Sequence, residues 1–159
     1  MVSQVYNSQF EFKIITSEKD LKTYYKLRED IFVREQKIFS GTDIDEYDEA
    51  AIHIAAIEKP SDRMVGGVRC YNLEGNTWVG GRLSAATGYR NGVVGRYLVK
   101  FAVETVKTRR CERFIAYVQP QNVRFFERLN WKRSGEPLIY HGIPHQLMEA
   151  ELGEGGGKA

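Results

Sequence analysis

The segment Gly81-Arg82-Leu83-Ser84 leads through a short connection to Arg90-Asn91-Gly92-Val93-Val94-Gly95-Arg96. The first part has the character of a strand end, and the second, rich in Gly and Arg, runs straight into apolar residues at helical spacing. A strand, a loop and a helix start in this order aim backbone N–H groups and the positive end of the helix dipole at one point. The stretch therefore predicts an anion-binding loop suited to a pyrophosphate, with Arg90 and Arg96 adding full charges beside it.

The segments around this loop predict an alternation of strands and helices. Alternating or continuous apolar runs predict strands at residues 10–16, 51–57, 64–73, 77–84 and 113–118. Apolar residues at helical spacing predict a helix over about 93–109, directly after the loop. A last strand is predicted over 147–151, and residues 138–141 could pair with it as a hairpin.

Two further helices complete the pattern. Ser17 is a candidate N-cap for the first, with Asp20 as a weak capping-box partner, and an apolar face follows between Leu21 and Phe32. A short helix over 122–129 is expected to end at Asn130 in a left-handed cap. The order β-α-β-β-β-α-β-α-β predicts an α/β (α+β) fold, with a mixed, mostly antiparallel sheet and helices on both faces.

The length of 159 residues favours a single domain. Residues 1–152 of the 159 are expected to form it, followed by a flexible Gly-rich tail at 153–159. The net charge of +2 gives little support to nucleic-acid binding, and the basic residues between Lys107 and Arg113 fit a solvated helix end. No segment approaches the roughly 20 apolar residues of a membrane span, so no membrane partner is expected.

The two cysteines, Cys70 and Cys111, are far apart in the sequence and have no partner at metal-ligand spacing. Both lie in or beside apolar runs, which predicts buried free thiols in a reducing compartment. The N-terminus lacks the basic and apolar regions of a signal peptide. We therefore expect a soluble, cytoplasmic protein without a metal site.

Three segments, taken in their order and spacing, resemble one superfamily. Leu27–Gln36 is similar to a first-helix signature, Arg90-x-x-Val93-x-Gly95 to an Arg/Gln-x-x-Gly-x-Gly/Ala loop, and Asn122–Trp131 to an Asn…Phe-Tyr-x-x-x-Gly-Phe element. Over residues 10–151 the chain thereby resembles the GNAT superfamily of acetyl-CoA-dependent N-acyltransferases. With Ala51–Ile54, Gly80–Leu83 and Pro144–Met148, it looks most like the nitrogen-starvation N-acetyltransferase branch of cyanobacteria and actinobacteria.

The resemblance implies that acetyl-CoA is the acetyl donor and that a small-molecule primary amine attacks its thioester directly, without a covalent enzyme intermediate. A backbone N–H in Leu83–Ala85 would polarise the thioester carbonyl. Asn122 matches a position that binds the pantetheine arm or orders the surroundings of the sulfur. The cofactor-binding residues implied in this way are Leu83, Ser84, Ala85, Arg90, Asn91, Gly92, Val93, Val94, Gly95, Arg96, Asn122, Phe125 and Phe126.

Two positions depart from the family pattern. Val93 replaces the first Gly of the loop pair, but with helical backbone angles its N–H would still point at the ligand, so we expect binding to survive. Phe126 stands where the family usually has a Tyr that protonates the leaving thiolate, and Phe has no proton to give. Tyr117, Tyr140 or water would then supply the proton.

The general base is open. Glu35, at the end of the first helix, could accept a proton through water or be a surface carboxylate, and His145 could transfer a proton or line the acceptor pocket. For His53, in an alternating strand, a hydrogen-bonded structural role is favoured over catalysis. The catalytic candidates are Glu35, Asn122, Tyr117 and His145.

The acidic run from Asp43 to Glu49 has three interpretations. A plain solvated loop is favoured over attraction of a cationic amine. A divalent ion fits least, because the run lacks the spacing of a 12-residue calcium loop.

Two other functions remain as alternatives. Arg28, Phe32, Asp45, Asp48 and Arg69 follow an order similar to that of the acyl-homoserine-lactone synthases, which share the GNAT fold and use an acyl carrier protein and S-adenosylmethionine. The Arg90–Arg96 loop is far closer to a CoA-binding loop. Phe126 would instead suit a catalytically silent CoA-binding protein. The acceptor amine is not encoded in any motif, and the apolar C-terminal strands could pair across a homodimer.

Overall fold

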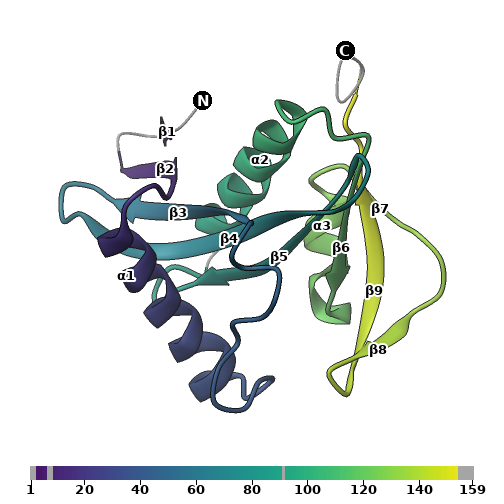
Figure 1. Ribbon diagram of the computed structural model, residues 1–159, viewed down its shortest axis with the longest axis horizontal. Coiled ribbons are helices and arrows are strands. Elements are labelled where there is room, and N and C mark those ends of the chain that lie inside the picture. The colour runs from purple at the N-terminus through teal and green to yellow at the C-terminus, as the bar shows by residue number, and fades with distance from the viewer. Residues whose placement is uncertain (1–2, 7–8, 91, 154–159) are drawn as a thin grey trace. The chain divides into compact units, whose positions relative to one another are not determined.

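The computed structural model describes residues 3–6, 9–90 and 92–153 (Figure 1). The chain forms two compact units, one made of Met1–Arg69 and Arg82–Ala102, the other of Cys70–Gly81 and Val103–Ala159. Most of the predicted tail, residues 154–159, lies outside the described residues.

The first unit is built on antiparallel strands. It holds β1 (Ser3–Tyr6), β2 (Phe10–Ile14), β3 (Ile52–Glu58) and the beginning of β4 (Arg63–Glu74), in the order β1-β2-β3-β4. The register runs from Ser3 opposite Lys13 to Tyr6 opposite Phe10, and from Phe10 opposite Glu58 to Ile14 opposite Ile54. The end of β5 (Thr77–Ala85) and the beginning of α2 (Val93–Lys107) also belong to this unit.

Helix α1 (Glu18–Arg28) follows β2 and continues into a π-helical segment, η1 (Glu29–Glu35). As predicted, the Ser17 hydroxyl caps it by accepting from the Asp20 N–H at 3.1 Å, while the Asp20 carboxylate pairs with Lys13. The apolar face of α1 packs on the sheet, where Tyr24 forms a core cluster with Ala55, Ile57 and Met64.

Two adjacent glycines of β4 place the helices of the first unit on opposite faces of the sheet. A Cβ atom at Gly66 would lie 2.8 Å from Cγ1 of Val94 in α2, and one at Gly67 would lie 2.6 Å from Cε1 of Tyr24 in α1. Neighbouring strand residues point to opposite faces. Helices α1 and α2 therefore cover the two faces of β4, as Figure 1 shows, which confirms the predicted layering for this unit.

The second unit combines parallel and antiparallel pairing. Its elements after α2 are β6 (Arg113–Val118), the 3₁₀ turn η2 (Pro120–Asn122), α3 (Val123–Glu127), β7 (Trp131–Arg133), β8 (Leu138–Tyr140) and β9 (Ile143–Ala150). Strand β6 pairs in parallel with β5, from Thr77 opposite Arg113 to Gly80 opposite Ala116. Strand β9 pairs antiparallel with β6, β7 and β8. The mixed, mostly antiparallel sheet is confirmed.

The differences from the predicted elements have local causes. Strands β1 and β7 are too short to show a pattern, and β9 begins at Ile143 instead of 147 because Pro144 tolerates a strand position opposite Ile139 in the β8 hairpin. Helix α2 ends at Lys107 because the next two N–H groups bond carbonyls only three residues back, Thr108 to Thr105 at 3.1 Å and Arg109 to Val106 at 2.9 Å. Arg110 then has a left-handed φ of 58°. Asn130 also has φ 68°, which confirms its predicted left-handed conformation after α3.

Both cysteines are free and buried, as predicted. Burial raises the pKa of the Cys111 thiol to about 11 and that of Cys70 further, so neither is a reactive thiolate near neutral pH. Within the described part of the chain, no helix combines the length and apolar character needed to cross a membrane.

The close approach at Gly66 gives a test of the packing. We expect Gly66→Ala to lower the free energy of unfolding by about 1–3 kcal/mol, because its Cβ would meet the Ser84 carbonyl oxygen as well as Val94, both at 2.8 Å. Urea denaturation measures this change. Lys100→Ala, on the exposed side of α2, is the control and should stay within about 0.5 kcal/mol of the parent. Equal stability of the two variants would contradict the packing.

Candidate functional site

The predicted anion-binding loop leads into a regular helix start. Gly92 has φ 92°, and its carbonyl accepts the first helical hydrogen bond, from the Arg96 N–H at 2.9 Å. Val93 is the first residue of α2, so the helical backbone predicted for it is confirmed. The N–H groups of Val94 and Gly95 come too early in the helix to find an acceptor within it. Asn91 lies outside the described residues.

Arg90 is already engaged in this loop. Its Nε donates to the Ala85 carbonyl at 2.8 Å, and its terminal nitrogens donate to both carboxylate oxygens of Glu35, one of them at 2.9 Å. The bond from Arg90 lowers the pKa of Glu35. Glu35 is thus stabilised as an anion, which makes it a weaker proton acceptor.

The remaining loop residues divide into exposed and buried positions. Arg96 is exposed in the first turn of α2, with its Cζ 5.0 Å from the Tyr97 ring. Ser84 is buried, and its hydroxyl lies 3.4 Å from the Gly67 carbonyl, while Leu83 and Ala85 are half-buried. The exposed cation thus lies beside the helix N-terminus, where an anion would be favoured.

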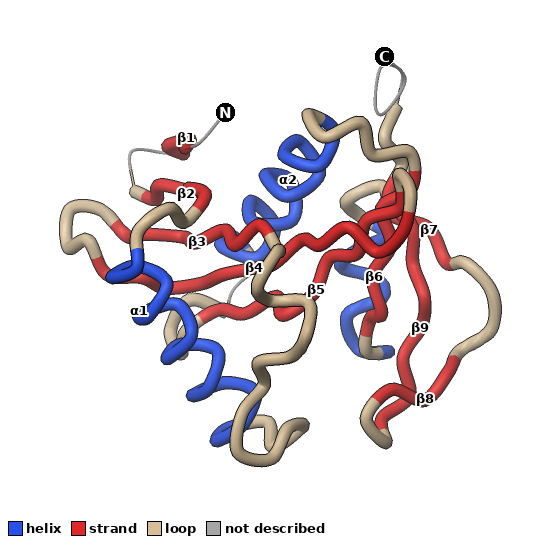
Figure 2. The backbone as a smooth tube through the Cα atoms, viewed as in Figure 1, coloured by secondary structure: helices blue, strands red, loops and turns tan. Residues whose placement is uncertain are grey.

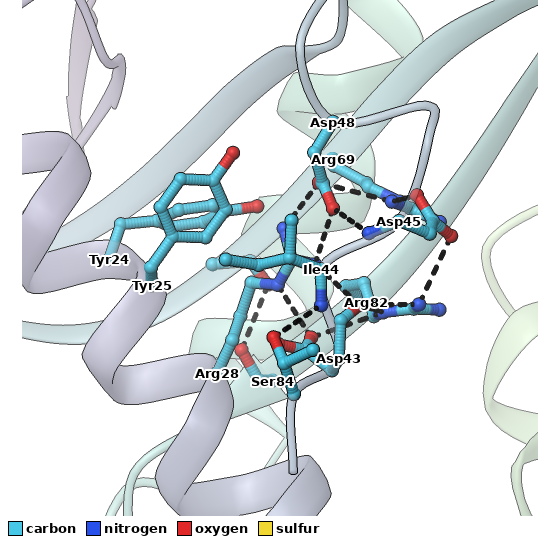
Figure 3. A network of polar contacts seen from close by, with 12 residues as sticks. Tyr24, Tyr25, Arg28, Asp43, Ile44, Asp45, Asp48, Arg69, Arg82 and Ser84 are labelled. Carbon is cyan, nitrogen blue, oxygen red and sulfur yellow. Dashed lines mark hydrogen bonds and ion pairs between the residues drawn. The ribbon is translucent and has the colours of Figure 1, made fainter. Parts of the chain in front are cut away.

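The acidic run enters a buried ion network in the first unit (Figure 3). Six side chains form it: Arg28, Asp43, Asp45, Asp48, Arg69 and Arg82. All are buried except Asp45, whose side chain is 31% exposed. Figure 2 shows the loop that carries the aspartates between η1 and β3. The favoured expectation of a solvated loop is therefore wrong for Asp43 and Asp48.

Each arginine of the network comes from a different element. Arg28 of α1 reaches Asp43 at 2.7 Å and Asp48 at 2.6 Å. Arg69 of β4 reaches Asp45 at 2.6 Å and Asp48 at 3.0 Å. The loop is thereby tied to α1, β4 and β5, and the three positive charges balance the three negative ones.

This balance bears on the interpretation that the acidic run attracts a cationic amine. Burial would raise the pKa of Asp48, but hydrogen bonds from Arg28 and from the Asp45 N–H outweigh it and hold that pKa well below its usual range. Each of the three aspartates is paired with arginines. The network therefore offers no net negative charge to attract a cationic amine.

His53 joins the same network as a structural residue. Its Nδ1 lies 3.1 Å from the Tyr24 hydroxyl and its Nε2 lies 2.9 Å from the Asp48 carbonyl oxygen. Burial lowers the pKa of the imidazole, which favours the neutral ring. The hydrogen-bonded structural role predicted for His53 is confirmed.

Arg82 combines its ion pairs with an unusual backbone. Its φ is 54°, in the left-handed region that costs an L-residue about 1–2 kcal/mol. Its Nε lies 3.1 Å from Oδ2 of Asp43, its Nη2 lies 3.3 Å from Oδ2 of Asp45, and its Cζ lies 4.2 Å from the centre of the Phe39 ring. These contacts fix the side chain of a strained residue immediately before Leu83.

In the second unit, three of the predicted proton-transfer candidates lie together. Tyr117 is 37% exposed, and its ring stacks on that of Tyr140 with centroids 5.7 Å apart. The buried His145 ring lies 5.2 Å from Tyr140, and its Nδ1 is 2.8 Å from the Ile143 carbonyl oxygen. A carbonyl only accepts, so Nδ1 carries the proton. In the neutral ring, Nε2 then holds the lone pair that can take up a proton.

The segment implied to contact the cofactor arm also lies in the second unit. Asn122 is exposed at the end of η2. Phe126 is buried between Phe125 and Trp131, with ring centroids 5.4 Å and 5.3 Å away, and Trp131 packs on Phe114. Phe126 is thus part of an aromatic core as well as the position of the missing Tyr.

The roles of Arg82 and Asp43 in the network were not predicted from the sequence. A usable signal was present, because Arg28 interrupts an apolar helix face and Arg69 lies inside the apolar run of β4. A charged residue in such a run is rarely buried unless it is paired.

Comparisons with known proteins identify a family. The model of the acetyltransferase (GNAT) family matches residues 15–131. The uncharacterized N-acetyltransferase YjcF of Bacillus subtilis strain 168 is 26% identical over 136 residues, which cover 85% of this chain and 95% of that protein.

Solved structures show the same fold. Escherichia coli ElaA superposes with a TM-score of 0.78 at 23% identity, over 89% of this chain and 99% of that one. The CoA-dependent acyl-homoserine lactone synthase BjaI superposes with a TM-score of 0.71 at 18% identity, over 86% and 78%.

The network predicts that two Asp→Asn variants differ strongly in their free energy of unfolding. We expect Asp48→Asn to lower the free energy of unfolding by about 3–5 kcal/mol at pH 7, because it leaves Arg28 and Arg69 buried and undercompensated. Asp30→Asn, in an exposed pair with Lys26 at 3.0 Å, should cost at most about 1 kcal/mol. Chemical denaturation of both variants measures this. A small, equal effect would contradict the structural weight of the network.

The lowered pKa of Asp48 also predicts how the stability of the protein depends on pH. The pKa of Asp48 is lower in the folded than in the unfolded chain, so its stabilising contribution is complete above the unfolded pKa of about 3.9 and is lost as the pH falls below it. The parent should therefore lose stability more steeply below about pH 4 than Asp48→Asn does.

Proposed function

This chain belongs to the GNAT family of acetyltransferases, and we propose that it transfers the acetyl group of acetyl-CoA directly to the amine of a small molecule. The observation that carries the proposal is the start of α2, where the early N–H groups of Val94 and Gly95 follow a left-handed Gly92 and precede the exposed Arg96. Backbone donors and a cation in this order suit a diphosphate.

The residues present fit such a donor. Val94, Gly95 and Arg96 would hold its diphosphate, and Arg90 would join them by exchanging the Glu35 carboxylate for a phosphate. The donor supplies a thioester-activated acetyl group. A backbone N–H in Leu83–Ala85 is our candidate for polarising the thioester carbonyl.

For proton transfer, we assign His145 the task of accepting the proton of the amine. Its Nδ1 bond to Ile143 leaves Nε2 as the basic nitrogen. Glu35 is the second candidate, because it loses the hydrogen bonds that lower its pKa when Arg90 binds a phosphate instead. Tyr117 is the candidate proton donor to the thiolate, and Asn122 is assigned to the pantetheine arm. Holding two reactants in position can contribute about 7–11 kcal/mol, more than one acid or base adds, so activity need not depend on a Tyr at 126.

Finer assignments follow from the sequence patterns. Ala51–Ile54 and Pro144–Met148 support a place in the nitrogen-starvation branch. Two buried free thiols suit a reducing compartment such as the cytoplasm. The apolar C-terminal strands support a homodimer, which sedimentation analysis would detect.

The ion network offers another explanation for the residues that resemble the acyl-homoserine-lactone synthases. Arg28, Asp45, Asp48 and Arg69, four of the five residues in that resemblance, bind one another. These residues anchor the acidic loop to α1 and β4, and this structural role accounts for an order similar to that of the synthases.

The direct test incubates the protein with acetyl-CoA and spermidine, benzylamine or a peptide with a free N-terminus. Free CoA thiol is followed with a disulfide reagent, against controls without amine or protein, and the acetylated product by mass spectrometry. Release that requires an amine supports the proposal. Binding of acetyl-CoA without turnover of any amine indicates a silent binding protein, and release that requires S-adenosylmethionine with an acyl donor indicates a synthase.

The loop assignment predicts a charge-dependent affinity. We expect Arg96→Glu to weaken acetyl-CoA binding about tenfold, because it reverses an exposed charge beside the early N–H groups of α2. Arg90→Ala should weaken acetyl-CoA binding less. In the parent, Arg90 must give up its bond to Glu35 before it can bind a phosphate, so its net contribution to the affinity is smaller. Calorimetry measures both. Arg109→Glu, an exposed arginine after α2, is the matched control, and affinities unchanged in both loop variants would overturn the assignment.

The aromatic core around Phe126 predicts how adding a hydroxyl group to this ring affects folding and kcat. We expect Phe126→Tyr to fold and to keep at least the parent kcat, because the substitution adds one polar atom to an otherwise equal ring. Steady-state kinetics and thermal unfolding check this. A tenfold or larger loss of kcat in a folded variant would show that Phe126 shapes the site and does not mark an absent acid.

A further inference from the structure

Arg82 has a backbone conformation that its surroundings must maintain. Among the described residues, it alone combines a left-handed φ, 54°, with a position inside a strand. An L-residue with a Cβ avoids this region, and Gly enters it freely. Such a residue persists where the structure around it over-determines its conformation.

The side chain of Arg82 supplies that constraint. Its Nη2 donates to the Asp43 carbonyl oxygen at 2.8 Å, and its Nε lies 3.1 Å from the Asp43 carboxylate. Asp45 accepts from the same Nη2 at 3.3 Å, and the Phe39 ring lies 4.2 Å from Cζ. Only 6% of the side chain is exposed, so water competes little with these bonds.

The conformation of Arg82 has a direct effect on its neighbour. The backbone angles of a residue orient the peptide group that follows it, so the left-handed turn at Arg82 sets the direction of the Leu83 N–H. Leu83 begins the stretch to which the proposed function assigns the polarising N–H. Electrostatic stabilisation of this kind depends on donors held in place before the reaction.

We propose that Arg82 is a positioning residue, whose bonds to Asp43 and Asp45 hold its backbone left-handed and thereby aim the Leu83 N–H at the thioester carbonyl. The inference rests on the proposed function, and it assigns a catalytic consequence to the buried network. Arg82 itself touches neither the donor nor the amine in this account.

Arg82→Ala and Arg82→Gly form a matched pair. Both lose the guanidinium, while Asp43 keeps Arg28 and Asp45 keeps Arg69 as partners. The two variants differ in backbone preference, because Gly retains access to the left-handed region and Ala disfavours it. Their difference therefore isolates the backbone conformation from the loss of charge.

The expected result has two parts. Arg82→Gly should melt at a higher temperature than Arg82→Ala, the reverse of the usual order of Gly and Ala inside a strand. With the amine that the parent turns over fastest, kcat of Arg82→Ala should fall at least about tenfold below that of Arg82→Gly, because loss of one such donor costs about 10²–10³-fold. KM for acetyl-CoA should differ less than threefold between them.

A vibrational measurement tests the hydrogen bond without an amine. The carbonyl stretch of bound [1-¹³C]acetyl-CoA should lie at lower frequency in the parent and in Arg82→Gly than in Arg82→Ala. Equal kcat and equal carbonyl frequency in the two variants would overturn the proposal, as would a lower melting temperature for Arg82→Gly.

The melting order separates this inference from the proposed function. If the parent neither binds nor turns over acetyl-CoA, the proposed function has failed, and the catalytic half of this inference fails with it. If neither Arg82 variant folds, Phe39→Leu keeps all six charges and removes only the ring beside the guanidinium. We then expect kcat to fall at least threefold with KM for acetyl-CoA within twofold, and an unchanged kcat would overturn the proposal.

Discussion

The mutual neutralisation of three arginines and three aspartates is the constraint on which the first unit depends. A single ion buried in protein costs several kcal/mol of desolvation, so each of these groups requires its partners. Arg28 belongs to α1, Arg69 to β4 and Arg82 to β5, while the aspartates share one loop. The charges can be satisfied only when all four segments are in place. Assembly of the helix, the strands and the loop is therefore coupled.

The distance in sequence between interacting residues explains which parts of the structure could be predicted. The strand, loop and helix start around Gly92 are local features, so apolar periodicity and turn chemistry predicted them, including the helical state of Val93. The network is not local. Its acidic members appeared as a charged loop because their partners lie in α1, β4 and β5, and the pairing of distant charges leaves no periodic trace. The strands β1 and β7 were missed because they have too few residues to show alternation.

The second unit shows a different balance between chemistry and packing. Phe126 is packed with Trp131 in an aromatic core. Tyr117, Tyr140 and His145 instead form a chain of ring contacts that includes an exposed hydroxyl-bearing ring. The proposed proton-transfer groups of this unit thus come from β6 and the β8–β9 hairpin. These candidates could be chosen from the sequence because of their residue types. The tautomer of His145 could not, because it depends on the contact of its Nδ1 with the Ile143 carbonyl oxygen.

The contact between Arg90 and Glu35 has a consequence for ligand discrimination. A carboxylate already fills the guanidinium fork, so a simple monoanion such as chloride or acetate gains little by replacing it. Under the proposed loop assignment, a ligand with two linked phosphates would engage the start of α2 and the fork together, which would compensate the displaced carboxylate. An internal competitor of this kind turns a general attraction for negative charge into a preference for polyvalent ligands.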